Sequence, residues 1–183
     1  MAAKTYKHGD KTKLSQHFAA CEFQCKCGKA HDFQIDDALI VKLETLFAEL
    51  KCSKIIVTSG FRCAAHDKAV GGNGSGQHTL GTAADICCYG QDGKPISSKT
   101  VCCKAQDLGF AGIANITSAY IYTHVDVRNN GRWYGDETRG TSTVTSDFYS
   151  YFGIAKPGNP APETKDVSIT IGGETWTGKL TKK

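Results

Sequence analysis

Two histidines and two aspartates are the residues of this chain whose types and spacing fit metal chemistry. His78 lies seven positions before Asp85, and His124 follows 39 residues after Asp85, with Asp126 two positions further on. Each histidine alone fits a surface or hydrogen-bonded role. Together they fit zinc, because imidazole and carboxylate are common zinc ligands and a catalytic zinc has three protein ligands and a fourth position for water. The sequence therefore predicts one zinc ion bound by His78, Asp85 and His124.

The segments around these ligands predict a loop and two strands that carry them to one side of a sheet. Residues 62–80 are rich in Gly, Asn and Ser, which is typical of a loop, and apolar and β-branched residues at 83–88 and 120–127 predict strands. Residues two apart in a strand share a face, so Asp126 is expected beside His124. Asp126 is the candidate general base, and orientation of a zinc ligand is its competing interpretation.

Periodicity elsewhere predicts an α+β domain in which helices flank an antiparallel sheet. Apolar residues recur at helical spacing over residues 35–50, with two aspartates at the start, and residues 97–108 predict a second helix. Residues 55–58 are β-branched and predict a buried strand. The alternation of helices and strands with hairpin returns is typical of the α+β class.

A change of composition near residue 153 divides the chain. Three of the four prolines lie between residues 153 and 166, which indicates a linker after a main domain of residues 1–152. Residues 167–183 alternate on both sides of Gly172-Gly173 and predict a C-terminal β-hairpin. A lone hairpin is marginally stable in water, so this one is expected to dock on the domain or a partner unless it is a flexible tail.

Composition and charge exclude several classes of protein. The 183 residues are 40% hydrophobic and 22% charged, as in soluble globular domains. The net charge of +4 is scattered, without a basic stripe, so no nucleic-acid partner is expected. The N-terminus is polar and no apolar stretch reaches the length of a signal sequence or membrane span. We expect a soluble protein made in the cytoplasm without membrane insertion, which reaches any external substrate after release or delivery.

The chain contains nine cysteines, an odd number that cannot all pair. Without a secretory signal, reduced and mostly buried thiols are expected rather than a disulfide framework. The segment 21–28 holds three of them, but it lacks the paired C-x-x-C spacing of zinc ribbons. The sequence therefore predicts no second zinc site.

Several separated motifs together carry a resemblance to a known family. The motifs are Ser59-Gly60-Phe61-Arg62-Cys63, His66, Gly71-Gly72, Gln77-His78, Gly81, Ala83, Asp85 and His124-Val125-Asp126-Val127-Arg128. With them, the chain resembles the D-alanyl-D-alanine carboxypeptidase family of zinc peptidases, over roughly residues 14–133. That family includes phage L-alanyl-D-glutamate endopeptidases and shares its fold with the hedgehog signalling domain.

The resemblance implies both a site and an activity. It places the zinc ligands at His78, Asp85 and His124, and it places at Arg62 an arginine that lines the active site and binds or stabilises substrate. The implied activity is that of a zinc metallopeptidase that hydrolyses an amide bond in the stem peptide or cross-link of bacterial peptidoglycan. Its setting would be phage-type lysis, as an endolysin, or wall remodelling. The bond remains open between D-Ala-D-Ala, L-Ala-D-Glu and a cross-bridge.

The sequence departs from the family pattern at four positions. Gly76 replaces a serine and Phe61 replaces a tyrosine. Ile121 and Ser118 stand where relatives carry an acidic residue before the last zinc histidine. Neither side chain can accept a proton from water, which is why Asp126 is the predicted base.

Two other classes of function are compatible with the same residues, because a fold does not fix a function. The first is a non-catalytic zinc-binding module, since the hedgehog domain uses this fold mainly as an interaction surface. The second is a virion or wall-associated structural protein, which the linker and hairpin would anchor. Zinc content without peptide cleavage would favour the first class, and a gene neighbourhood with holin or tail genes would separate lysis from assembly.

Overall fold

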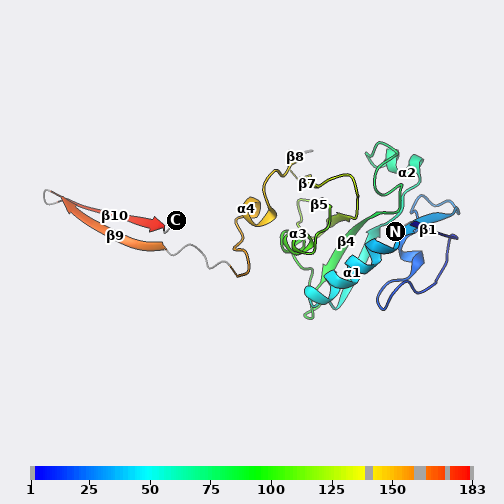
Figure 1. Ribbon diagram of the computed structural model, residues 1–183, viewed down its shortest axis with the longest axis horizontal. Helices are drawn as coiled ribbons and strands as arrows, with labels where there is room; N and C mark the ends of the chain where they lie inside the picture. Colours follow the sequence, from blue (N-terminus) through cyan, green and yellow to red (C-terminus); the bar gives the residue numbers. More distant parts are fainter. Residues whose placement is uncertain (1–2, 139–141, 159–163, 172–173, 182–183) are drawn as a thin grey trace. The chain divides into compact units, whose positions relative to one another are not determined.

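The computed structural model describes residues 3–138, 142–158, 164–171 and 174–181. The chain forms two compact units, Met1–Phe148 and Tyr149–Lys183. The first unit contains helices and strands in alternation around a central sheet, and the second contains a β-hairpin (Figure 1). This architecture confirms the predicted α+β class.

The chain begins with a small sheet of its own. Strand β1 (Ala3–Tyr6) pairs antiparallel with β2 (Phe33–Asp36), and a single 3-10 turn, η1 (Ala20–Phe23), lies between them in sequence. Phe18, Phe23 and Phe33 are each about 1% exposed, so this N-terminal segment contributes to the core. Residues 3–36 thus belong to the first unit and contribute to its core.

Helix α1 (Asp37–Glu49) is the amphipathic helix that periodicity predicts, but it begins two residues later than expected. Asp36 is extended and its side chain accepts a hydrogen bond from the Ala38 N–H at 2.8 Å. An N-cap aspartate of this kind stabilises a helix start, so residues 35 and 36 complete β2 instead. Leu39, Leu43 and Leu46 are fully buried on the inner face.

The central sheet has six strands in the order β3-β4-β6-β5-β7-β8. Neighbours are antiparallel except β5 and β7, which are parallel. This pair differs from the expected antiparallel sheet because β6 reverses direction from β5, and β7 reverses again and is added on the far side of β5. The strands are β3 (Lys54–Ser59), β4 (Ala83–Tyr89), β5 (Gly112–Asn115), β6 (Thr123–Asp126), β7 (Trp133–Asp136) and β8 (Ser142–Thr143).

Two segments differ locally from their predicted structure. The strand expected over residues 120–127 is shortened to β6, because Tyr120 has a φ of 52°, a left-handed conformation that a strand cannot contain. The expected loop 62–80 contains a short helix, α2 (Ala64–Ala69). Cys63 caps its N-terminus, because Cys63 Sγ accepts a hydrogen bond from the His66 N–H.

The two faces of β6 have different neighbours. The Thr123 hydroxyl donates to the Ser98 hydroxyl at 2.9 Å, so this face is covered by α3 (Ser98–Asp107), which also contacts α1. Alternation along the strand then directs His124 and Asp126 to the opposite face. His124 and Asp126 therefore share the face that α3 leaves free.

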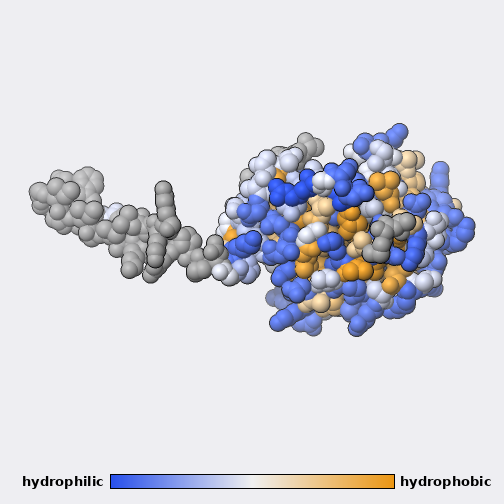
Figure 2. All heavy atoms as spheres, viewed as in Figure 1, coloured by the Kyte–Doolittle hydropathy of each residue, from blue (hydrophilic) through white to orange (hydrophobic). Residues whose placement is uncertain are grey.

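On the face of the first unit seen in Figure 2, apolar residues lie in patches among polar ones. The largest exposed apolar side chains are Val41, Ile56, Val70 and Leu80. Six of the nine cysteines are buried and the other three are half-buried. No described helix combines the length and the apolar character needed to cross a membrane.

The second unit begins within α4 (Phe148–Phe152) and ends in an antiparallel hairpin of β9 (Thr164–Ile171) and β10 (Glu174–Thr181). The predicted hairpin is present, but β9 begins at Thr164, within the expected linker of residues 153–166. The expected turn at Gly172-Gly173 and residues 159–163 of the expected linker lie outside the described residues.

Candidate active site

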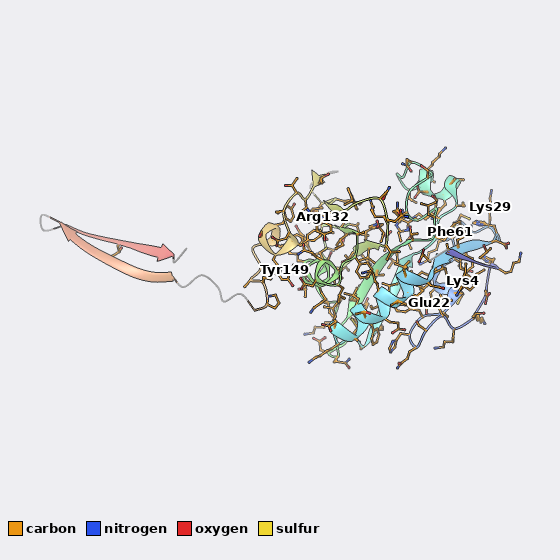
Figure 3. All side chains as sticks on the ribbon, viewed as in Figure 1. Lys4, Glu22, Lys29, Phe61, Arg132 and Tyr149 are labelled. Atoms are coloured by element: carbon orange, nitrogen blue, oxygen red, sulfur yellow. The ribbon has the colours of Figure 1, made fainter. Side chains whose placement is uncertain are left out.

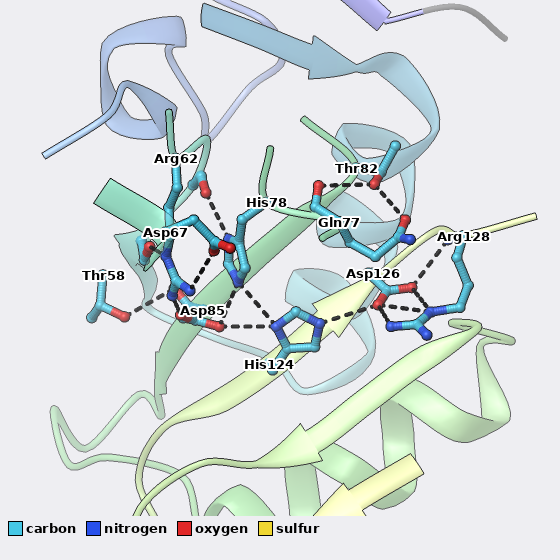
Figure 4. A network of polar contacts seen from close by, with 12 residues as sticks. Thr58, Arg62, Asp67, Gln77, His78, Thr82, Asp85, His124, Asp126 and Arg128 are labelled. Carbon is cyan, nitrogen blue, oxygen red and sulfur yellow. Dashed lines mark hydrogen bonds and ion pairs between the residues drawn. The ribbon is translucent and has the colours of Figure 1, made fainter. Parts of the chain in front are cut away.

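Three donor atoms from distant parts of the chain converge in the first unit (Figure 4). His78 Nε2 lies 3.2 Å from Asp85 Oδ1 and 3.2 Å from His124 Nδ1, and His124 Nδ1 lies 3.0 Å from Asp85 Oδ1. All three residues are less than a tenth exposed. The structure thus brings together the three residues that the sequence predicts as zinc ligands.

Strand register explains this convergence. Asp85 in β4 is directly opposite His124 in β6, and opposite residues of an antiparallel pair project from the same face. His78 reaches them from the loop before β4. That loop turns at Gly81, where φ is 71° and an added Cβ would overlap the backbone of Gln34, so only glycine fits.

Hydrogen bonds to the second ring nitrogens fix both imidazoles. His78 Nδ1 contacts the Gly60 carbonyl oxygen at 2.7 Å, and His124 Nε2 contacts Asp126 Oδ2 at 3.1 Å. Since both partners are acceptors, each of these nitrogens donates. In a neutral ring the other nitrogen, Nε2 of His78 or Nδ1 of His124, then has a free lone pair. Both lone pairs face the point where the three donor atoms converge. Metal-binding histidines are typically oriented in this way.

The donor set fits a single zinc ion. Ligands at 2.0–2.1 Å from a tetrahedral zinc are about 3.3 Å apart, close to the observed spacing.

The charges around the three donors also favour a bound cation. Burial alone would lower the pKa of His124, but Asp126 and Asp85 outweigh it and raise this pKa to about 9. Burial alone would raise the pKa of Asp85, but His124 and His78 hold it well below its usual range.

The three ligands line an open cavity of about 730 Å³. The lining comes from α2 and the glycine-rich loop after it, from residues that follow β5 and β6, and from β7 and the residue after it. Polar and aromatic side chains provide most of the remaining lining: Arg62, Asp67, Asn73, Gln77, Arg128, Trp133 and Glu137. The cavity therefore opens the point where the three donors converge to solvent.

Arg62 lies in this cavity beside the metal centre. Its guanidinium contacts the Asp85 carboxylate, its Nε donates to the Ser59 hydroxyl at 2.8 Å, and it forms an ion pair with Asp67 at 3.5 Å. The side chain is only 17% exposed. Arg62 therefore orients the ligand Asp85 and also presents positive charge to the cavity.

The structure places Asp126 differently from the role of general base that the sequence suggested. Its side chain is fully buried, it does not line the cavity, and it accepts bonds from His124 and from Arg128 Nε at 2.9 and 3.0 Å. Burial raises its pKa, but His124 and Arg128 outweigh this and leave the pKa well below its usual range. Asp126 shares the face of His124 as predicted, but it lies behind the ring. This arrangement favours the competing interpretation, orientation of His124.

The space for the Asp126 carboxylate is provided by Gly112. In the register of β5 and β6, Gly112 is directly opposite Asp126, and an added Cβ at Gly112 would overlap that carboxylate. A larger residue would force the carboxylate away from His124. Gly112 therefore leaves the space in which the Asp126 carboxylate contacts His124.

Glu137 is a carboxylate of the cavity that no sequence motif indicated. It follows β7 directly, is solvent-exposed and lines the cavity with the three ligands. Its pKa is raised, because partial desolvation of the carboxyl group in the cavity outweighs the opposing charge of His124. Of the two other described carboxylates in the lining, Asp85 is one of the three converging donors, and Asp67 is 3% exposed and contacts Arg62 and the Gly74 N–H.

No sequence signal separated Glu137 from its neighbour Asp136. The two acids are adjacent, and neither has a diagnostic spacing from His124. In the structure Asp136 is 1% exposed and accepts bonds from Asn115 Nδ2 at 3.1 Å and the Thr138 hydroxyl at 2.6 Å. Strand β7 ends at Asp136, whose side chain is buried, and the next residue, Glu137, lines the cavity.

Comparison with known proteins places the chain in a family. A search of curated proteins finds no match. The sequence model of the family described as peptidase M15 matches residues 16–126, more than half of the chain, and this region contains His78, Asp85 and His124. Peptidases of this family depend on zinc, in agreement with the three converging donors. The chain therefore belongs to the peptidase M15 family, the zinc peptidases of the D-alanyl-D-alanine carboxypeptidase type, as its motifs predicted.

Proposed function

We propose that the protein is a zinc metallopeptidase that hydrolyses an amide bond in the stem peptide or cross-link of bacterial peptidoglycan. The observation that carries this proposal is the convergence of His78 Nε2, Asp85 Oδ1 and His124 Nδ1 within 3.2 Å of one another in an open cavity. Membership of the peptidase M15 family supports peptide hydrolysis. A buried site with four protein ligands would instead indicate a structural metal.

The roles of the residues follow from their positions. His78, Asp85 and His124 would hold the zinc ion, which lowers the pKa of bound water and polarises a scissile carbonyl. We propose Glu137 as the general base, because it offers an exposed carboxylate to the same cavity. It would take a proton from the attacking water and pass it to the leaving amine. Asp126 would keep the His124 ring in its metal-binding orientation.

The cavity lining suits a short peptide with a free carboxylate. Arg62 and Arg128 both line it, and the Arg128 guanidinium lies 5.2 Å from the centre of the Trp133 ring. Each arginine is paired with a buried aspartate, so each is held in place with part of its guanidinium facing the cavity. Stem peptides of peptidoglycan carry carboxylates that such arginines bind. Activity on the wall in lysis or remodelling would require release or delivery of the protein to it.

The test is incubation of the zinc-loaded protein with purified muropeptides, followed by mass spectrometry. Loss of a terminal D-Ala would identify a carboxypeptidase, a cut between L-Ala and D-Glu an endopeptidase, and separation of linked stems a cross-bridge enzyme. The His78→Ala/His124→Ala variant is the control and should give no products. If the folded, zinc-loaded protein cleaves none of these substrates, the non-catalytic zinc-binding module becomes the better reading.

A further inference from the structure

Four soft metal ligands gather outside the active site. The side chains of Cys25, Cys27, His31 and Cys63 place one ligand atom each within 4.8 Å of all the others. Cys27 Sγ lies 3.1 Å from His31 Nε2. None of the four lines the active-site cavity. We propose that these residues bind a second zinc ion, with a structural role.

The chemistry of the donors selects the metal and the role. Three thiols and one imidazole form a Cys3His set, which is typical of structural zinc, and soft thiolates disfavour calcium and magnesium. Zinc–sulfur bonds of 2.3 Å place two sulfurs about 3.8 Å apart in a tetrahedral site. The observed upper limit of 4.8 Å is within about 1 Å of this spacing. Four protein ligands leave no position for water, so the site would not be catalytic.

Neighbouring groups hold the ligands ready for a metal. Cys25 Sγ accepts a hydrogen bond from the Cys63 N–H at 3.3 Å, and Cys63 Sγ accepts one from the His66 N–H at 3.4 Å. Such partners behind the sulfur ligands hold them in a fixed orientation. His31 Nδ1 lies 3.2 Å from the Asp32 carbonyl oxygen, so it donates there and leaves Nε2 directed at Cys27.

The loop that carries Cys25 and Cys27 is tied to the central sheet. Lys26 lies between them and its Nζ donates to the carbonyl oxygens of Val57 at 3.1 Å and Thr58 at 2.6 Å in β3. The loop then turns at Gly28, where φ is 78°. These contacts keep both sulfurs near the end of β3, where Cys63 follows.

Cys63 joins the cluster through a close approach of two backbones. The Phe61 N–H donates to the Phe23 carbonyl oxygen at 2.7 Å, and a Cβ on Gly60 would lie 2.5 Å from the Phe23 Cα. Phe61, labelled in Figure 3, packs its ring against that of His31, with centroids 6.3 Å apart. Local spacing of cysteines cannot reveal this site, because its fourth ligand comes from a segment that only the fold brings near.

The cluster is connected to the active site through residues 60–63. The Gly60 carbonyl oxygen accepts the bond from His78 Nδ1, and Arg62 contacts Asp85 and donates its N–H to the His78 carbonyl oxygen at 3.1 Å. An ion bound to Cys63 would therefore fix the segment that orients two catalytic ligands. We expect its loss to weaken zinc binding at the active site as well.

Zinc content and X-ray absorption of the full chain, purified with a reductant, test this inference. We expect two zinc ions per chain and zinc–sulfur scattering at about 2.3 Å. The active-site ligands offer only nitrogen and oxygen, so sulfur scattering must come from the cluster. The His78→Ala/His124→Ala variant should keep one sulfur-bound zinc. Cys27→Ser/His31→Ala should lose it, whereas Cys21→Ser, a half-buried cysteine outside the cluster, should keep both ions.

Three results would overturn the inference. The first is one zinc per chain with only nitrogen and oxygen neighbours in the unmodified protein, a measurement that does not depend on any variant folding. The second is sulfur scattering that persists in Cys27→Ser/His31→Ala. The third is a disulfide involving Cys25, Cys27 or Cys63 in zinc-replete protein. Sulfur-bound zinc without muropeptide cleavage would support this inference and refute the proposed enzymatic function.

Discussion

Replacement of Asp126 by asparagine separates orientation of a zinc ligand from proton transfer. In the structure the Asp126 carboxylate accepts bonds from His124 Nε2 and from Arg128, and both partners are donors. An asparagine amide has one oxygen acceptor and one NH2 donor, so in Asp126→Asn a donor must face either His124 or Arg128. The side chain is fully buried, and water cannot take the place of the lost acceptor.

The expected magnitude follows from the lost interaction. A hydrogen bond to a charged group contributes about 1.5–3 kcal/mol, and about 1.4 kcal/mol corresponds to a tenfold change in an equilibrium constant. Zinc affinity at the site of His78, Asp85 and His124 should therefore fall roughly 10- to 100-fold, which is also the range for outer partners of metal ligands. Turnover at saturating zinc should stay near wild type, because the base is not removed.

The assay combines competition with a chromogenic chelator, which gives zinc affinity, and muropeptide turnover at saturating zinc. Glu137→Gln is the matched control and should show the opposite pattern. It should keep zinc affinity and lose turnover by about 10²- to 10⁴-fold, the usual contribution of a general base. If Asp126→Asn keeps zinc affinity and loses turnover by more than about 100-fold, Asp126 is the base and the role assigned to Glu137 is wrong.

Three further predictions concern the metal ligands, the second unit and pH. His78→Ala, Asp85→Ala and His124→Ala should each remove most zinc from the nitrogen- and oxygen-ligated site, and full retention in any two would exclude the assigned site. Deletion of residues 154–183 should leave the melting transition and zinc content of the remaining chain near wild type, since the compact first unit ends at Phe148; insoluble or zinc-free protein would show that the hairpin belongs to the core. The pKa of Glu137 is raised and a base must be ionised, so kcat/KM should fall as pH decreases through that pKa, with zinc content measured at each pH; an unchanged acid-side decline in Glu137→Gln would contradict this.

The sequence by itself determined the fold class, the family and the grouping of His78, Asp85 and His124. These features depend on local patterns and donor chemistry. Apolar residues at helical spacing give α1, and a short apolar run gives β4. Two imidazoles and a carboxylate near a glycine-rich loop indicate zinc whatever the angles between the elements are.

Only the tertiary structure decided what surrounds those ligands. The period-2 rule placed Asp126 on the face of His124, but it could not show that Arg128 binds this carboxylate behind the ring. Glu137 reaches the cavity because β7 is added parallel to β5, a topology that no local pattern encodes. The fold alone brings Cys63 close to Cys25, Cys27 and His31. It does so because Gly60, which has no side chain, lets the backbone before Cys63 contact the backbone of Phe23. Contacts between segments distant in sequence depend on strand order and backbone approach, which local patterns do not specify.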